Sequence, residues 1–514
     1  MVTRNPQPYQ RSAEPWVLAA SILGSSMAFI DGTVVNVALP VLQKALGATA
    51  IEVQWVVESY ALALASLLLL GGALADRLGR RRIFALGVSL FALASIGCAV
   101  APGIRWLIAA RAVQGIGAAL LVPTSLALLG ASFPPERRGR AIGRWSAFSA
   151  AAGGVGPVLG GWLIQVGSWR WVFWINVPIA AVSLGIIWRR VPESRAPDAG
   201  PRLDLVGAGL VTLGLGSLVF GLLEAPRLGF DHPVIIGALA GALVILAAFV
   251  LVEARTPDPM LPLDLFHART FSGSNLVTLL LYAALGGLLF FLPFLLIQVH
   301  QYSPLRAGAA FLPFIVLMSL LSGRSGRLVD RYGARTPLIV GPLIAAIGFS
   351  LLALPGTGGS YWKSFFPGVT VLGLGMAITV APLTTAVMTA AGPERAGLAS
   401  GVNNAVARTA GLLAIAVFGI VIYGRFSQSL AQRLDQLGVP AEVRRLLAAE
   451  RGRLAAARIP SSLPSGLRKV IQGAIDGAFV DGFRLVVMLA AGLALVAAVI
   501  AWWLIEREPG ARKV

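Results

Sequence analysis

The segment Gly72-Ala-Leu-Ala-Asp-Arg-Leu-Gly-Arg-Arg81 has a counterpart in Gly326-Arg-Leu-Val-Asp-Arg-Tyr-Gly-Ala-Arg335. Both fit the pattern G-x-L-x-D-R-x-G-x-R, and each follows a long apolar run. Internal repeats of this kind are found in large helical membrane proteins built from two related units. The repeat therefore indicates that the chain consists of two homologous halves.

Composition assigns these halves to a membrane. The 514 residues are 57% hydrophobic and 13% charged, whereas a soluble domain carries about 25% charged residues. The 59 glycines suit helices that approach closely inside lipid. Although the net charge is +19, the basic residues lie in short loops between apolar runs, so we expect a lipid bilayer as the surroundings and no nucleic acid partner.

Apolar runs long enough to span a membrane, which takes about 20 residues, predict an all-α integral membrane protein with fourteen transmembrane helices. If spans one to six match spans nine to fourteen, each repeated motif follows the second helix of its half. We expect a six-helix bundle in 1–190, two inserted helices in 191–269 and a second six-helix bundle in 270–514. The predicted spans are 16–40, 53–75, 83–101, 106–131, 142–166, 171–189, 205–225, 233–252, 271–298, 304–323, 336–355, 361–391, 398–424 and 482–505.

The arginines predict the orientation, because loops on the cytoplasmic side of a membrane are enriched in basic residues. The loops of one parity are arginine-rich, and those of the other hold about one basic residue each. Both termini are therefore expected in the cytoplasm, in a cell (inner) membrane. The first span is too long for a signal peptide. The arginine-rich clusters are Arg77 with Arg80 to Arg82, Arg137 with Arg138 and Arg140, Arg189 with Arg190 and Arg195, and Arg324 with Arg327, Arg331 and Arg335.

Residues 425–480 carry nine basic residues yet are expected outside, where long translocated segments are largely exempt from the rule. Leu430, Leu434 and Leu437 follow a helical spacing. This spacing predicts an amphipathic helix lying on the outer surface. A solvated loop with local helix is the alternative.

Asp31, Glu58 and Arg111 stand out among the ionisable residues inside the predicted spans, with Arg408 further along; such residues usually mark a pathway or proton relay. At about 1.5 Å per residue, Asp31, Glu58 and Arg111 reach a similar depth in the outer half of the membrane. Protonation weakens a carboxylate–arginine pair, so two carboxylates competing for Arg111 would form a proton switch. Alternatively, Arg111 bonds backbone carbonyls and Glu58 extends to the interface.

The repeated loops are expected to act in gating, since an aspartate there can bond a helix N-terminus or an arginine when that side is closed. The alternative is an arginine cluster that only sets orientation. In span five, glycines surrounding a proline favour a specific bend and close packing between the halves. The residues assigned to gating are Gly72, Asp76, Arg77, Gly79, Arg80, Asp330, Arg331, Gly156, Pro157, Gly160 and Gly161.

These motifs resemble the major facilitator superfamily, and in particular its fourteen-span drug/proton antiporter family, over nearly the whole chain. Residues 31–40 are similar to the family's span-one signature, and 72–81 to its loop motif. Residues 111–117 are similar to a span-four motif implicated in proton coupling. Residues 143–161 match the antiporter pattern G-x8-G-x3-GP-x2-GG, except that Ala152 stands where the family has glycine.

The resemblance implies the major facilitator fold and a proton-coupled antiporter that exports drugs or other small lipophilic molecules by alternating access. It places Asp31, Glu58 and Arg111 at positions used for coupling or for substrate charge. Family members often export lipophilic cations, but span thirteen offers Arg408 without a carboxylate, which would repel a cation unless it faces away, so neutral or anionic antibiotics are also candidate cargo. Other residues assigned to the substrate cavity, with core packing as the alternative for the aromatic ones, are Asn36, Tyr282, Phe290, Asn403 and Asn404.

Other function classes receive less support. Proton-coupled import, or transport of metabolites or lipids, remains an alternative within the same fold. The chain has no HExxH, no nucleotide-binding GxxxxGK[ST] and one cysteine, Cys98, so we expect no enzyme, ATPase, metal site or cofactor, with protons as the coupling ion. Nothing in the sequence decides whether a periplasmic adaptor assembles with it.

Overall fold

The computed structural model describes residues 13–195, 204–257, 259, 261–392 and 394–506. These residues form helices and no strands, and fourteen helical segments are long and apolar enough to cross a membrane. The predicted all-α membrane fold with fourteen spans is therefore confirmed. Some spans begin with a short helix followed by a longer one.

The chain folds in the following order. Its first part comprises α1 (Glu14–Leu46), α2 (Ala50–Leu78), α3 (Arg80–Ala99), α4 (Ile104–Ser132), α5 (Pro135–Val166), α6 (Trp171–Trp174) and α7 (Asn176–Arg190). Then come α8 (Leu205–Leu228), α9 (Pro233–Glu253) and the 3-10 turn η2 (Leu263–His267). The last part comprises α10 (Arg269–Phe294), the π-helical turn η3 (Leu295–Val299), α11 (Pro304–Ala309), α12 (Leu312–Tyr332), α13 (Arg335–Leu352), α14 (Tyr361–Ser364), α15 (Phe366–Ala391), α16 (Ala396–Gln436), α17 (Ala441–Ala449), the 3-10 turn η4 (Arg451–Ala456) and α18 (Ser465–Leu504).

In both of its copies, the repeated motif ends one helix at a glycine and leads directly into the next helix. Gly79 ends α2 with a φ of 116°, and Gly333 ends α12 with a φ of 70°. A side chain is strained at these angles, so glycine allows the chain to turn at once into the next helix. The motif thus links the same two helices of each half, as its spacing predicts.

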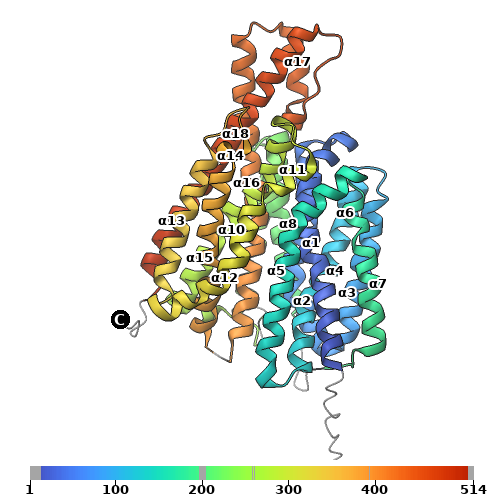
Figure 1. The fold of residues 1–514 in the computed structure, drawn as a ribbon, viewed down its shortest axis with the longest axis vertical. Coiled ribbons are helices and arrows are strands. Elements are labelled where there is room, and N and C mark those ends of the chain that lie inside the picture. Colours follow the sequence, from blue (N-terminus) through green and yellow to red (C-terminus); the bar gives the residue numbers. More distant parts are fainter. Residues whose placement is uncertain (1–12, 196–203, 258, 260, 393, 507–514) are drawn as a thin grey trace, which may run out of the picture.

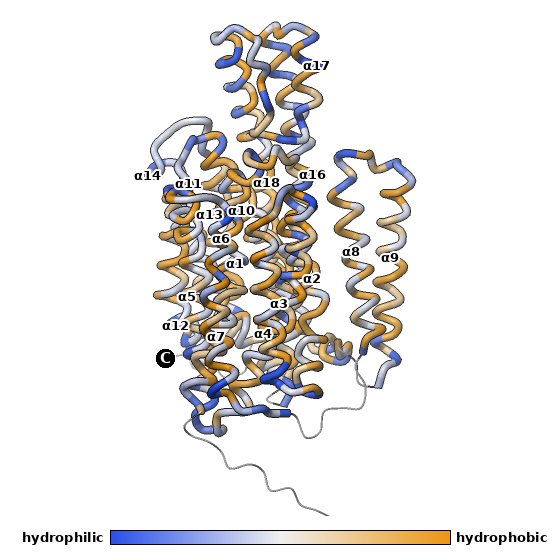
Figure 2. The backbone as a smooth tube through the Cα atoms, turned by 90° about the vertical axis from the view of Figure 1, so that its right-hand side faces the viewer, coloured by the Kyte–Doolittle hydropathy of each residue, from blue (hydrophilic) through white to orange (hydrophobic). Residues whose placement is uncertain are grey.

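Two groups of helices pack side by side (Figure 1). In the α1–α7 group, α2 packs on α4, α3 on α4 and α1 on α5, whereas in the α10–α18 group α13 packs on α15 and α10 on α18. The groups meet where α5 contacts α11 and α2 contacts α16. Helices α8 and α9 pack on each other and stand beside the bundle in Figure 2, with α8 touching both α2 and α16. The domain limits given above stay a prediction.

The segment 425–480 does not lie flat. Helices α16 and α18 continue beyond the bundle, and with α17 they form a projecting helical hairpin (Figure 1). The surface-helix prediction is wrong because Leu430, Leu434 and Leu447 turn inward and are buried in one cluster with Ile471 and Ile475. The apolar face is therefore covered by the hairpin itself.

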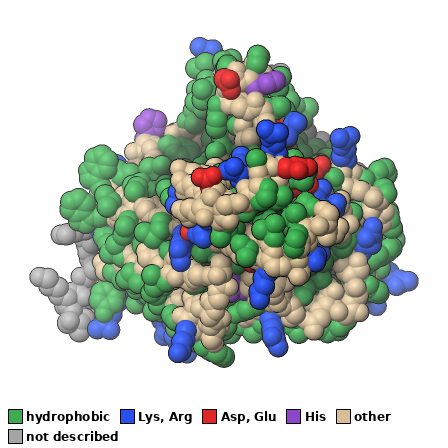
Figure 3. All heavy atoms as spheres, turned by 90° about the horizontal axis from the view of Figure 1, so that it is seen from above, with side chains coloured by type: hydrophobic (Ala, Val, Ile, Leu, Met, Phe, Trp, Pro, Cys, Tyr) green, Lys and Arg blue, Asp and Glu red, His purple; other side chains and the backbone are tan. Residues whose placement is uncertain are grey.

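We call the end of the molecule that carries α17 the hairpin end. The opposite end, with the turns from α2 to α3 and from α12 to α13, is the arginine-rich end. Viewed from the hairpin end, Lys and Arg side chains are scattered among apolar ones (Figure 3), as expected from the nine basic residues of segment 425–480.

Candidate functional site

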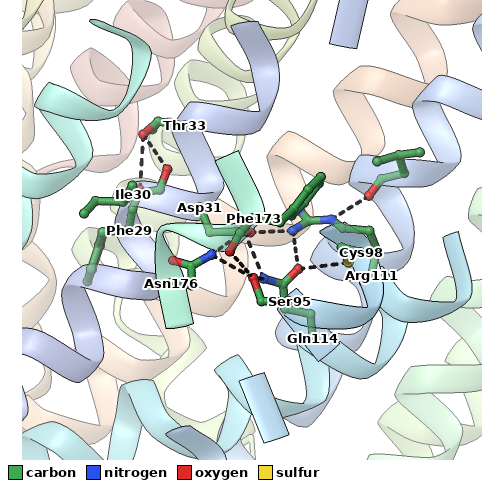
Figure 4. Close-up of polar contacts among 11 residues, drawn as sticks. Phe29, Ile30, Asp31, Thr33, Ser95, Cys98, Arg111, Gln114, Phe173 and Asn176 are labelled. Carbon is green, nitrogen blue, oxygen red and sulfur yellow. Dashed lines mark hydrogen bonds and ion pairs between the residues drawn. The ribbon is translucent and has the colours of Figure 1, made fainter. Parts of the chain in front are cut away.

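A buried ion pair lies inside the α1–α7 group. Asp31 of α1 has no exposed surface, and Arg111 of α4 is 1% exposed. Nη1 of Arg111 donates to Oδ2 of Asp31 and also to Oε1 of Gln114, at 2.7 Å. Gln114 in turn donates its Nε2 to Oδ1 of Asp31 at 3.0 Å (Figure 4). Buried charges need this degree of pairing, so the prediction that Asp31 and Arg111 meet agrees with the geometry.

Three uncharged side chains complete the network, and none of them was predicted. Ser95 of α3 accepts from Nδ2 of Asn176 at 3.0 Å and from Nε2 of Gln114 at 3.3 Å. Asn176 of α7 also points its Nδ2 at Asp31, at 3.5 Å, and Sγ of Cys98 lies 3.7 Å from Oε1 of Gln114 (Figure 4). Gln114 follows Arg111 by three residues on one helix face, which is the one signal the sequence offered.

Arg111 also connects the network to α2. Its Nε donates to the carbonyl of Val56 at 3.0 Å. Its guanidinium carbon lies 4.2 Å from the ring centroid of Tyr60, within cation–π range. Both neighbours lie one turn apart on α2, so any change in the charge of Asp31 acts on a cation that holds this helix.

Glu58 is buried but lies outside the network. It has no exposed surface, and neither carboxyl oxygen has a hydrogen-bond partner. One turn earlier on α2, Nε2 of Gln54 donates across to the carbonyl of Ile415 on α16, at 3.2 Å. The expectation that two carboxylates share Arg111 is therefore wrong for this structure, because Arg111 binds Asp31 and Glu58 stays unpaired.

The polar residues predicted on α16 behave differently from one another. Nδ2 of Asn403 donates to Oδ1 of Asn275 at 3.1 Å and to Thr278 at 2.6 Å, which places it within the α10–α18 group. Asn404 is exposed and bonds the backbone of its own helix. Arg408 is half-buried.

Of the remaining cavity candidates, Phe290 is a core residue. It is 2% exposed and its ring lies 4.8 Å from that of Phe291, so the core-packing alternative holds for it. Tyr282 is partly buried against the same core. Asn36 is half-buried on α1.

Residues of the first copy of the repeated loop bond to each other and to the chain just after α7, within the α1–α7 group. Arg80 forms a salt bridge with Asp76 at 2.8 Å, and its backbone N–H donates to the carbonyl of Ser194 at 2.9 Å. A Cβ on Gly79 would lie 2.8 Å from the Glu193 carboxyl. In the second copy, the guanidinium of Arg331 lies 5.3 Å from the Tyr332 ring, and the side chain of Asp330 is outside the described residues.

The glycines of span five make close helix contacts. A Cβ added to Gly156 would lie 1.9 Å from Oγ1 of Thr33 on α1, and one on Gly161 would lie 2.4 Å from the carbonyl of Pro304. Helix α11 also contributes a glycine to this contact, since a Cβ on Gly308 would lie 2.0 Å from the carbonyl of Pro157. The predicted packing between the halves is thus present. Gly160 also meets α1, at Val34.

Contacts between the two groups gather toward the hairpin end. There, Gln298 donates to Oε1 of Gln43 at 2.8 Å, and Gln43 donates to the carbonyl of Arg453 at 3.2 Å. Toward the arginine-rich end, polar residues of α5, α15 and α16 are exposed. We infer that the contacts between the two groups close the hairpin end. The exposed polar residues are Arg144, Ser146, Thr384, Thr385 and Asn404.

A family model described as "Major Facilitator Superfamily" matches residues 21–415. The chain belongs to this superfamily. It is therefore a multi-pass membrane transporter, as the repeated loop and the buried charges indicated.

Relatives within the superfamily include the "Tetracenomycin C resistance and export protein" of Streptomyces glaucescens, 33% identical over 97% of this chain and 93% of that protein. The "Puromycin resistance protein pur8" of Streptomyces alboniger is 36% identical over 96% of this chain and 91% of that protein. The "Multidrug resistance protein Stp" of Mycobacterium tuberculosis (strain ATCC 25618 / H37Rv) is 37% identical over 84% and 80%, respectively.

Solved structures show the same fold. A bacterial homologue of the human lysosomal transporter Spinster, in an inward-facing and unoccupied conformation, superposes with a TM-score of 0.65 over 98% of this chain and all of that one. Its sequence is 18% identical, so the likeness concerns the fold.

Proposed function

We propose that this transporter exports small lipophilic, drug-like molecules across the cytoplasmic membrane in exchange for protons. The observation that carries the proposal is the buried Asp31–Arg111 pair, one carboxylate and one cation sealed from water. The direction of transport is supported by relatives named for resistance and export. The arginine-rich end faces the cytoplasm, because basic loops are retained there.

The coupling step is a proton exchange at Asp31. Charged, Asp31 holds Arg111 through a charge-assisted hydrogen bond, the stronger kind. Protonation removes that charge and leaves Arg111 with Gln114 and the Val56 carbonyl. A proton arriving from outside thus loosens the contact between α1 and α4, and its release to the cytoplasm restores the contact.

Glu58 is proposed as a second proton carrier. A buried carboxyl group without hydrogen-bond partners is held at lower cost in its neutral form, so we assign it a proton in this conformation. Glu58 lies on the face of α2 that meets α16. Separation of α2 from α16 would therefore expose Glu58 to water. Cargo would enter between the groups from the arginine-rich end, which faces the cytoplasm in this proposal.

Inside-out vesicles test the proposal. An acidic lumen drives a proton antiporter to accumulate a fluorescent cargo, whereas it would drive a proton-coupled importer to expel cargo. Asp31→Asn should reduce accumulation about 10- to 100-fold, since a hydrogen bond to a charged group contributes about 1.5–3 kcal/mol. Asp435→Asn is the matched control, because this carboxylate lies in the hairpin and is 74% exposed.

Two results would overturn the proposal. Accumulation by Asp31→Asn at the normal rate and with the normal pH dependence would remove Asp31 from coupling. Expulsion of cargo by the unaltered protein under an acidic lumen would reverse the direction of transport.

A further inference from the structure

A cavity lies at the edge of the bundle, away from the ion pair. It has a volume of about 470 Å³ and lies between α2, α8, α10 and α16, with Phe249 of α9 closing one side. The lining is largely apolar. Its side chains include Leu69, Leu215, Leu276, Phe266 and Val406.

The cavity lies at the depth of lipid hydrocarbon. Leu276 is seven residues into α10, which places it about 10 Å along the helix from the arginine-rich end. The hydrocarbon of one leaflet is about 15 Å thick. Leu276 is 40% exposed at this depth, and α9 is little buried, with 11% of its most apolar stretch buried. We therefore expect lipid chains around the cavity.

Nearer the hairpin end, helix α8 covers the line along which the α1–α7 group meets the α10–α18 group. Val219 and Leu223 of α8 pack with Leu412 and Ala416 of α16 in a single buried cluster. Nε1 of Trp55 on α2 donates to Oε1 of Glu224 at 3.3 Å. Helix α8 thus contacts both groups there, and the cavity is what remains open below that contact.

The floor of the cavity is the segment between α9 and α10. The backbone N–H of Leu261 donates to Oε2 of the buried Glu253 at 3.0 Å, which folds the segment under the cavity. Exposed basic side chains Arg255 and Arg269 lie at the two ends of this segment. Among the described residues of this segment, the exposed carboxylate Asp264 is already paired with Arg395, and Asp258 lies outside the described residues. Within the described part of the chain, the exposed charges at the two ends of this segment are therefore positive.

We propose that this cavity binds one acyl chain of an anionic phospholipid from the leaflet at the arginine-rich end, with the phosphate near Arg255 and Arg269. An apolar slot with basic residues at the ends of its floor matches a lipid whose chain is buried and whose headgroup is negative. The walls come from α2 on one side and from α10 and α16 on the other. A lipid bound here favours the conformation seen in this structure to the extent that it binds other conformations less well.

Photo-crosslinking of the full-length protein in liposomes tests the proposal. The probe is phosphatidylglycerol with a diazirine in one acyl chain, and the labelled peptides are identified by mass spectrometry. We expect labels in 65–69, 211–215 and 402–409. Leu215→Trp, which fills the cavity, should lower labelling there about tenfold, as expected when about two buried methylene groups are displaced.

Controls separate the cavity from general lipid contact. Leu243→Trp changes a residue of α9 that is 71% exposed and should leave labelling unchanged. Val406→Phe fills the cavity from α16, in case Leu215→Trp lowers the thermal stability. The double variant Arg255→Gln, Arg269→Gln should abolish the preference for phosphatidylglycerol over phosphatidylcholine as competitor.

Several outcomes would overturn the inference. One is labelling of the three segments no stronger than that of the exposed face of α9. Another is an equal loss with Leu215→Trp and Leu243→Trp. Displacement of the probe by a lipophilic dye, but not by unlabelled phospholipid, would assign the cavity to cargo instead. Transport direction and proton coupling do not enter these measurements.

Discussion

Closure at the hairpin end depends on the contact between two helix backbones, α5 and α11. In Gly308→Ala, the new Cβ would lie 2.0 Å from the carbonyl oxygen of Pro157 and 3.2 Å from Cα of Val158, against an ordinary contact of at least 3.4 Å. Backbone atoms cannot rotate away, so the helices must separate. Overpacking of this kind costs about 1–3 kcal/mol, which shifts a two-state equilibrium about 5- to 150-fold toward the state open at the hairpin end.

Thiol labelling measures this shift. Ala307, which has no exposed surface in this conformation, is replaced by cysteine in a Cys98→Ala background and exposed to a membrane-impermeant maleimide. We expect faster labelling in Gly308→Ala by a similar factor. Gly424→Ala is the control, since its Cβ would meet nothing within 4 Å while gaining the same helix propensity of about 1 kcal/mol. Equal labelling rates in a folded Gly308→Ala protein and in the control would refute the reasoning.

Three further predictions concern other contacts. Arg453→Ala removes the hydrogen bond from Nη2 to the carbonyl of Gly47. A loss of about 1 kcal/mol should speed maleimide labelling at position 307 about fivefold, and an unchanged rate would exclude the Arg453 side chain as a closing contact. Gln114→Leu removes two partners of Asp31 and Arg111 and should shift the pH profile of transport, whereas an unchanged profile would make Gln114 a packing residue. Burial lowers the pKa of His300, so neutral His300 stabilises the folded protein above the unfolded-state pKa of about 6.5, and this stabilisation is lost as pH falls. His300→Gln should therefore reduce the loss of Tm between pH 7 and pH 5. An equal loss of Tm in both proteins would argue against this.

The sequence predicted depth better than direction around a helix. Asp31, Glu58 and Arg111 were placed at one depth from the rise per residue, and Asp31 does meet Arg111. Glu58 does not, because it lies about 200° around α2 from Val56 and Tyr60, the two residues that contact Arg111. The depth of a residue in the membrane follows from counting residues along its helix. Which partner the residue meets depends on which helix packs against its face, and the count does not give this.

Uncharged polar residues escaped prediction for a different reason. Ser95 and Asn176 are ordinary residues in membrane helices, where their side chains can bond neighbouring backbone. Only the packing of α3 and α7 around α1 brings them to Asp31. The hairpin is similar, because leucines at helical spacing suit both a surface helix and a pair of helices that cover each other.

One route from the ion pair to the contact between the two groups runs through α2. Arg111 holds α2 by the Val56 carbonyl and the Tyr60 ring, and the opposite side of α2 meets α16 through Gln54. In the proposed proton exchange, a proton on Asp31 would leave Arg111 with Gln114, the Val56 carbonyl and the Tyr60 ring as its partners. Movement of α2 in response would then disturb the Gln54 contact and give water access to Glu58. We therefore expect the proposed exchange to run in this order: Asp31 is protonated first, α2 moves second, and Glu58 exchanges its proton last.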